Sequence, residues 1–295
     1  MNRVEFGKLV VALRRGIRDD EDRSWSQKRL GEQTELGEAT IGKIERGERV
    51  NLDPDTLSRL ANAMYLTTVE RREFFIAAMG VDNHQMTRPE MNSKKVLDDM
   101  VHVIEEVRLP ALIVDSYGDL VAANTALTQI LEIPSDFVAN AHAEPASFNL
   151  MRIIFAPECD NVRNIFGVQW TKTAVYNIEF FRYTTLRYRF TDYFLQTLRQ
   201  LRKYPLFRQY WHQFGSQQED NYFNSERCSY EHPRHGAVHY LTTLSTALTT
   251  SGELYFVTYV PANARTAEVF AGLADHGDKG ALRLASWPEK RLARG

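Results

Sequence analysis

The stretch SQKRLGEQTELGEATIGKIERGER, residues 26–49, holds two short helical patterns on either side of one glycine-bearing turn. Ser26 is a residue type that caps helices, and Leu30 follows it as the apolar anchor of the first pattern. Gly37 precedes the second pattern, in which Ile41 and Ile44 recur at helical spacing. This stretch predicts two crossing helices, the arrangement that inserts a helix into DNA.

Helical periodicity continues on both sides of this pair. Apolar residues at helical spacing predict a first helix that ends near Arg18. Asp53 and Pro54 predict the cap and first turn of a fourth helix, and Thr68 opens a fifth that reaches Met79. Five short helices predict one all-α domain over residues 1–80.

Charge is balanced over the whole chain, with a net charge of -2 over 295 residues, of which 43% are apolar and 25% charged. This composition indicates a globular protein of two domains, whose affinity for nucleic acid depends on a local surface. Three cations of the quoted stretch, on either side of its second helix, are placed to reach phosphates: Lys28, Arg46 and Arg49. Five residues of its second helix are expected to point outward: Glu38, Ala39, Thr40, Gly42 and Lys43.

The alternative is a plain helical bundle with a charged exterior. The quoted stretch resembles the Cro/phage-repressor type of helix-turn-helix, the XRE-like family, in its Ser-Gln opening, its apolar turn residue Leu36 and its T-I-x-x-I-E-x-G run. The resemblance covers residues 3–79 and implies a lambda-repressor-like five-helix domain that binds a double-stranded DNA operator. It also implies that Gln27 contacts the DNA backbone, that residues 38, 39, 42 and 43 face bases, and that Glu45 is a structural partner of an arginine. Gly37 departs from the family's usual Ser or Thr cap.

Residues 81–95 lose the apolar periodicity and predict a linker. Residues 96–275 predict a second domain that begins with a helix and continues with strand-like runs at 111–115 and 120–123, where Asn124 can cap the next helix. An aromatic helical middle and a late hairpin, 237–248 with 254–260, follow before a short helix and a polar tail over 276–295. The expected class is α+β multidomain.

The residues after 80 hold 28 of the 33 aromatic residues, which indicates either an ordinary core or an apolar pocket in the second domain. The segments LPALIVDSYGDLVAANTAL, FNLMRIIFAP and LFRQYWHQF resemble the MmyB-like ligand-binding domain of bacterial regulators. This resemblance implies a PAS-like sensor domain with an antiparallel sheet and a pocket for a small hydrophobic ligand, with a fatty acid the usual suggestion. Candidate wall residues are Phe180, Phe181, Phe194, Tyr210 and Trp211. Arg152 is a candidate anchor for a carboxylate, although the residues alone favour the alternative, a surface arginine paired with an acid.

No phosphate-binding or hydrolase motif is present, so we expect no catalytic cofactor and no enzyme. Cys159 and Cys228 are isolated and form no recognisable nucleophile site. Pro233 and Gly236 interrupt any helix that could align Cys228 with the nearby histidines His232, His235 and His239, so we expect no metal site. A basic stripe at 187–204 is interpreted as a solvated helix face rather than a membrane or DNA contact.

The sequence therefore predicts a cytoplasmic, homodimeric transcription regulator that binds an operator and a small hydrophobic ligand, and no membrane. Two alternatives remain. The second domain could be a ligand-free dimerisation or protein-interaction module, or less plausibly a cryptic enzyme.

Overall fold

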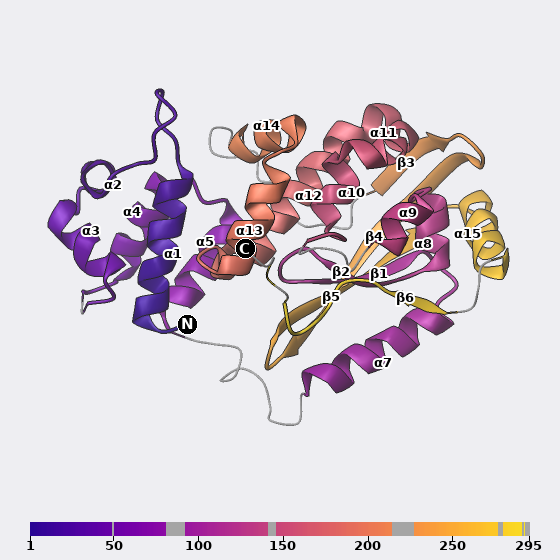
Figure 1. The fold of residues 1–295 in the computed structure, drawn as a ribbon, viewed down its shortest axis with the longest axis horizontal. Coiled ribbons are helices and arrows are strands. Elements are labelled where there is room, and N and C mark those ends of the chain that lie inside the picture. Colours follow the sequence, from indigo (N-terminus) through magenta and orange to yellow (C-terminus); the bar gives the residue numbers. More distant parts are fainter. Residues whose placement is uncertain are drawn as a thin grey trace.

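The computed structural model describes residues 1–48, 50–80, 92–140, 146–213, 227–276, 280–290 and 292. The helices of residues 1–80 form one lobe, which we call the helical lobe, and residues from 92 onward form a second lobe around a β-sheet, the sheet lobe (Figure 1). The α+β class is confirmed. The boundaries expected for the linker lie largely outside the described residues, and α7 already begins at Ser93.

The helical lobe consists of five helices whose caps lie close to the expected positions. Ser26 accepts a hydrogen bond from the Arg29 amide at 3.1 Å, and Asp53 accepts one from the Thr56 amide at 2.7 Å. The fifth helix is capped by Thr67, one residue before the expected start. The helices are α1 (Arg3–Gly16), α2 (Gln27–Thr34), α3 (Glu38–Glu45), α4 (Pro54–Ala63) and α5 (Thr68–Ala78).

The core of the helical lobe is completed by the sheet lobe. Leu9, Leu30, Leu60 and Phe74 are fully buried at its centre. Leu186, from the 3₁₀ turn η3 (Leu186–Tyr188) of the sheet lobe, is fully buried in the same cluster. The two lobes therefore share apolar packing.

The sheet lobe is built on one six-stranded antiparallel sheet with the strand order β3-β4-β5-β1-β2-β6. The hairpin of β4 and β5 is confirmed, although both strands extend further than expected and leave only residues 250–251 for the turn. The edge strands β3 and β6 were not expected from the sequence. The strands are β1 (Ala111–Asp115), β2 (Leu120–Asn124), β3 (Arg227–His232), β4 (Gly236–Thr249), β5 (Gly252–Pro261) and β6 (Ala281–Arg283).

Helices cover both faces of the sheet (Figure 1). On one face Leu97, Val101 and Ile104 of α7 (Ser93–Glu106) pack against Ile113 and Val121. The other face packs against the remaining helices, and Asn124 caps the first of them as expected. These helices are α8 (Thr125–Ile130), α9 (Ser135–Ala139), α10 (Leu150–Phe155), α11 (Asp160–Phe166), α12 (Trp170–Thr185), α13 (Asp192–Leu201), α14 (Pro205–Gln213) and α15 (Ala264–His276), with short 3₁₀ turns η1 (Pro157–Cys159) and η2 (Gly167–Gln169).

The expectation of a polar C-terminal tail is wrong for its described residues. β6 pairs with β2, where Leu282 lies opposite Ala123, and Leu284 is buried. Further along, the Lys290 ammonium reaches the buried carboxylates of Asp115 and Asp119. Apolar residues and one lysine, each with a distant partner, hold this segment against the sheet.

Candidate DNA interface and ligand cavity

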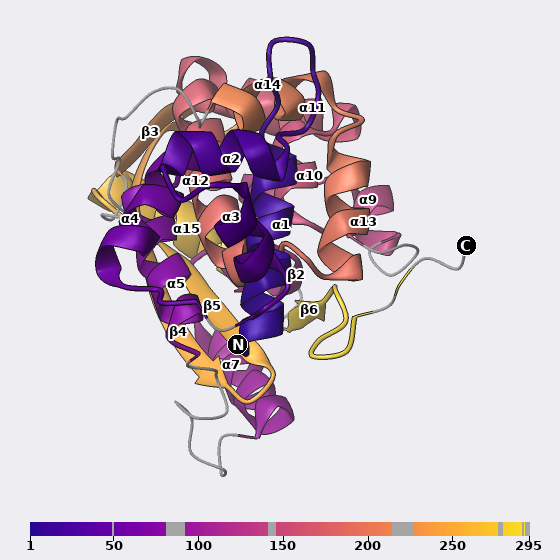
Figure 2. The ribbon, with the colours of Figure 1, turned by 90° about the vertical axis from the view of Figure 1, so that its left-hand side faces the viewer.

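The second helix of the helix pair, α3, lies on the side of the helical lobe that faces away from the sheet (Figures 1 and 2). Glu38, Ala39 and Lys43 are exposed on it, and Thr40 is half-buried. Short or polar side chains on the outer face of such a helix suit base edges in a major groove. These four residues therefore form a free surface of the kind that DNA reading requires.

A buried polar network fixes α3 against α1 and α2. The Glu45 carboxylate accepts hydrogen bonds from Arg14 Nε at 2.6 Å, from Arg14 Nη2 at 3.0 Å and from Gln27 Nε2 at 2.6 Å. Arg14 and Glu45 are almost inaccessible to solvent. The structural role of Glu45 as an arginine partner is thus confirmed. Gln27, expected at the DNA backbone, uses its amide nitrogen inside the protein.

The turn between α2 and α3 depends on two glycines. Gly37 has φ +77°, a conformation that side chains rarely adopt, which explains why no Ser or Thr cap stands there. A Cβ on Gly31 would lie 2.7 Å from the backbone of residues 37 and 38. The close approach of the two helices therefore requires glycine at position 31.

Gly42 differs from the expected outward position because it is buried. A Cβ at Gly42 would lie 3.1 Å from Arg46 Nη1 and 3.7 Å from Gln27 Oε1, so these two side chains cover it. Arg46 is exposed and pairs with Glu48, and Lys28 lies 4.0 Å from Glu32. Both cations remain accessible to phosphates. Arg49 lies outside the described residues.

An apolar cavity of about 80 Å³ lies in the sheet lobe, between the sheet and helices α8 and α10–α12. Its wall includes Leu112, Leu120, Leu127 and Val257. No acidic or basic side chain is among the described residues that line it. Its chemistry therefore suits an uncharged, apolar group.

One side of α12 lines this cavity. Thr173, Tyr176, Asn177 and Phe180 recur at helical spacing and all contribute to the wall. On β4 across the cavity, the Thr242 hydroxyl is buried and has no hydrogen-bond partner among the described residues. A buried hydroxyl without a partner costs free energy, so Thr242 can gain by bonding a polar atom of a ligand.

The comparison with protein families assigns the sheet lobe. Residues 96–273, more than half of the chain, match the family described as MmyB-like transcription regulator ligand binding domain. The chain belongs to this family. Residues 17–69 of this MmyB-like regulator match a helix-turn-helix family. A comparison with curated proteins found no match. The two matched families make the chain a transcription regulator with a DNA-binding and a ligand-binding part, and neither family is enzymatic.

The wall residues expected from the sequence lie in three different places in the MmyB-like regulator. Phe180 lines the apolar cavity. Phe194 and Trp211 line a cleft between the two lobes. Phe181 is fully buried against Phe194 and Trp211, and Tyr210 packs on the rings of residues 155 and 170. These aromatics were expected to line one pocket, but among them only Phe180 is in the wall of the apolar cavity.

Arg152 has local partners. It donates to the Glu158 carboxylate at 2.7 Å and to the Ser147 carbonyl at 3.1 Å, and its guanidinium lies 5.1 Å from the centre of the Phe137 ring. It is not among the described residues that line the apolar cavity. This geometry corresponds to the alternative considered from the sequence, an arginine paired with an acid.

An ion triad between the lobes was not expected from the sequence. Glu70 on α5 of the helical lobe accepts from Arg182 of α12 at 3.1 Å and from Arg189 at 2.5 Å, and all three side chains are buried. Burial alone would raise the pKa of the Glu70 carboxyl, but the two guanidiniums and the Thr67 amide lower it to about 2. We call this group the interlobe triad.

The basic stripe at 187–204 is therefore not one solvated face. η3 ends at Tyr188 and α13 begins at Asp192, so the stripe spans two elements. Arg189 is buried in the interlobe triad, and burial lowers the pKa of its guanidinium to about 10. The sequence does contain a signal against one solvated face, because the apolar residue Phe190 lies among these cations. In the structure its side chain packs against the helical lobe.

Two other expectations concern metals and membranes. In the part of the chain that is described, no group of three or more His, Cys, Asp or Glu residues is placed to hold a metal ion. His239 instead contacts Ser229, and His232 contacts the Ile130 carbonyl. No helix among the described residues is long and apolar enough to cross a membrane.

Proposed function

We propose that this regulator binds its operator through α3 and that an apolar ligand, a fatty acid or a similar molecule, alters operator binding from the cavity of the sheet lobe. The observation that carries the proposal is the double role of α12. Phe180 of this helix lines the cavity, and Arg182, two residues later, binds Glu70 of the helical lobe. A ligand that moves α12 therefore moves a buried contact of the DNA-binding part.

The size of the cavity supports a mechanism that requires movement. About 80 Å³ is roughly the volume of three water molecules and lies well below the several hundred Å³ of ordinary ligand pockets. An acyl chain gains about 0.8 kcal/mol for each buried methylene, so it has a driving force to widen the cavity. The wall at α12 would then shift, and a ligand shifts an equilibrium only through such differential binding.

The polar end of the ligand would lie at β4. Thr242 offers its unpartnered hydroxyl, and the neighbouring Thr243 and Leu244 line the cavity while being exposed to solvent. Because the described wall holds no cation, a carboxylate would be stable only at this exposed end, where water solvates it.

The first experiment is mass spectrometry of the purified protein, under native and then denaturing conditions. We expect a co-purified mass of a few hundred daltons that is released on unfolding. Val257→Phe fills the cavity, so this variant should co-purify without the ligand. Val260→Phe, on the same strand but outside the cavity wall, should still co-purify with it. A clean mass for the wild-type protein would favour the ligand-free interaction module.

Operator reading requires its own test, because a dimer with two copies of α3 is proposed here to read a palindrome. A binding sequence is first selected from a random duplex library. Glu38→Ala and Lys43→Ala should then reduce the preference for that sequence more than they reduce binding to unrelated DNA. Equal weakening on all duplexes would show that α3 does not read bases. Sedimentation of the protein with the selected duplex gives the number of chains bound.

Coupling between the two sites is tested with the same duplex. Glu70→Gln keeps a hydrogen-bond acceptor for Thr67 but removes the charge that holds Arg182 and Arg189. The variant should still bind the ligand and the duplex while losing the effect of one on the other. An unchanged ligand effect in Glu70→Gln would refute the proposed route through α12.

A further inference from the structure

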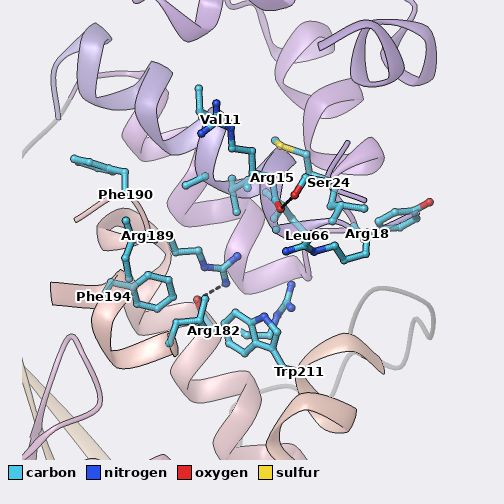
Figure 3. Close-up of a pocket in the computed structure, with 18 of the residues that line it drawn as sticks. Val11, Arg15, Arg18, Ser24, Leu66, Arg182, Arg189, Phe190, Phe194 and Trp211 are labelled. Carbon is cyan, nitrogen blue, oxygen red and sulfur yellow. Dashed lines mark hydrogen bonds between the residues drawn. The ribbon is translucent and has the colours of Figure 1, made fainter. Parts of the chain in front are cut away.

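A cleft of about 1660 Å³ lies between the two lobes (Figure 3). The helical lobe contributes α1, the loop that follows it, and the start of α5, while the sheet lobe contributes α13 and parts of α12 and α14. The cleft is remote from α3 (Figure 1) and shares no lining residue with the apolar cavity. Neither the DNA interface nor the cavity accounts for it.

Its wall is strongly basic, and we call it the basic cleft. The only carboxylate among its described lining residues is Asp22, and Glu70 lies behind the wall in the interlobe triad. Such an excess of one sign raises the local concentration of anions. The seven cations are Lys8, Arg15, Arg18, Arg71, Arg182, Arg189 and Arg202.

Two of these cations, Arg18 and Arg202, interact across the cleft from opposite lobes, and Asp22 is the one carboxylate beside them among the described lining residues. Arg18 donates to the Asp22 carbonyl at 3.0 Å. The Nε of Arg202 is buried and has no hydrogen-bond partner among the described residues. Burial and the charge of Arg18 lower the pKa of Arg202 more than the Asp22 carboxylate raises it, so the repulsion between the two guanidiniums is only partly compensated. An anion between them would relieve this repulsion and accept charge-assisted hydrogen bonds.

The basic cleft also exposes apolar surface. Tyr65 from the helical lobe is 47% exposed and Leu195 from α13 is 44% exposed, and both line the cleft. Phe190 and Leu198 continue this wall beneath Leu195. Large apolar side chains beside unpaired cations suit a ligand with a charged head and an apolar body.

We propose that the basic cleft is a second ligand site, which binds an amphiphilic oxyanion, either a carboxylate or a phosphate ester with an apolar body. The head lies between Arg18 and Arg202, and the body covers Tyr65 and Leu195. Since these groups come in pairs from the two lobes, the bound anion joins the lobes and stabilises their described arrangement. It therefore acts on the DNA-binding part directly, without passing through the apolar cavity.

Isothermal titration calorimetry of the full chain tests this site with octyl phosphate, octanoate and inorganic phosphate. Octyl phosphate should bind, and inorganic phosphate should bind more weakly because it has no apolar body. Arg18→Gln and Arg202→Gln should each weaken octyl phosphate by about tenfold or more. Arg265→Gln, an exposed arginine on α15, is the matched control and should leave the affinity unchanged.

A second variant separates the two parts of the ligand. Leu195→Ser changes an exposed position, so it should not affect folding. It should weaken octyl phosphate and leave inorganic phosphate unchanged. The comparison of octyl phosphate with octanoate shows which head the arginine pair prefers, and both affinities should fall as salt is added.

Three outcomes would overturn the proposal. The first is that no probe binds the wild-type protein. The second is that Arg18→Gln and Arg202→Gln bind octyl phosphate as the wild type does, with an unchanged unfolding midpoint. If Val257→Phe alone removes binding, the probe occupies the apolar cavity; the basic cleft is then refuted as a site while the proposed function stands.

Discussion

Two buried ion clusters in this protein have opposite composition. In the interlobe triad, one carboxylate, Glu70, lies between two guanidiniums. In the second cluster, which we call the C-terminal cluster, one ammonium, Lys290, lies between the carboxylates of Asp115 and Asp119. The pKa of Glu70 falls to about 2, whereas burial, aided by the charge of Asp119, raises the pKa of Asp115 to about 6 in spite of Lys290.

The difference shows that burial does not by itself decide how a charge behaves. Glu70 has two cations and a backbone amide around it, so the charged form is the stable one. Asp115 competes with Asp119 for a single cation, so its charged form is only partly compensated. The interlobe triad therefore stabilises the contact between the lobes most when Glu70 is ionised. The C-terminal cluster stabilises the fold most when Asp115 is protonated.

The largest expected effect comes from breaking the interlobe triad. Glu70→Gln removes the buried carboxylate that Arg182 and Arg189 share, which should lower the free energy of unfolding by about 3–5 kcal/mol. Urea unfolding measures this change. As a control, the triple variant with Leu at 70 and Met at 182 and 189 removes every charge and should recover most of the loss. Equal losses in both variants would show that packing matters more than charge.

Acid should have nearly as large an effect on the wild-type triad. The folded pKa of Glu70, about 2, lies below its ordinary 4.5, so its contribution is complete above pH 4.5 and is lost as the pH falls toward 2. The contribution is roughly 3 kcal/mol, from about 1.4 kcal/mol per pKa unit. Urea unfolding at several pH values should show this loss in the wild type and not in Glu70→Gln. If the wild type and Glu70→Gln lost the same free energy of unfolding on acidification, groups other than Glu70 would be responsible for the acid sensitivity.

The C-terminal cluster should respond in the opposite direction. Lys290→Met leaves two buried carboxylates, which raises the pKa of Asp115 further and should cost about 2 kcal/mol at pH 7. Because the folded pKa of Asp115, about 6 in the wild type, lies above the ordinary 3.8, its contribution to stability is complete below about pH 3.8 and is lost as the pH rises through 6. Lys290→Met raises this pKa, so the variant should go on losing stability up to a higher pH. Lys290→Arg keeps the charge and should show little loss. A loss in Lys290→Met that is independent of pH would contradict this explanation.

The smallest effect is expected for an exposed ion pair, which serves as a reference for both clusters. Arg59 and Asp55 lie 2.5 Å apart on α4 and are both exposed. Water already stabilises each charge, so Arg59→Ala should give no resolvable change in the urea midpoint. A clear change would mean that surface charge, and not burial, underlies the behaviour of the two clusters.

The helical lobe was largely predictable because its signals are local. Ser26 and Asp53 each cap a helix by accepting from an amide three residues later, so their roles follow from short-range sequence, and Asn124 does the same in the sheet lobe. The T-I-x-x-I-E-x-G run likewise placed Ile41, Ile44 and Glu45 correctly. The exposure of Gly42 was wrong because it depends on two side chains that fold over it from positions 27 and 46.

The candidate sites of the sheet lobe were less predictable because their partners are distant. Phe180 and Phe181 are neighbours in sequence but lie on different sides of α12. Phe180 lines the apolar cavity, whereas Phe181 packs against aromatic rings of α13 and α14. Arg152 is the exception, because its partners Ser147 and Glu158 are local and correspond to the alternative of an arginine paired with an acid. Composition alone could not show which aromatic side chains line a space and which fill one.

The sequence by itself determined the positions of most helices and strands, the helix-turn-helix and the family of the sheet lobe, because periodicity, caps and motifs act within a few residues. Only the tertiary structure decided where the buried charges meet. Arg182 lies 112 residues from Glu70, and Lys290 lies 171 residues from Asp119. A charged side chain can join two distant segments in this way only when the fold buries it beside a partner of opposite charge. No short-range sequence pattern shows which residues will be buried together.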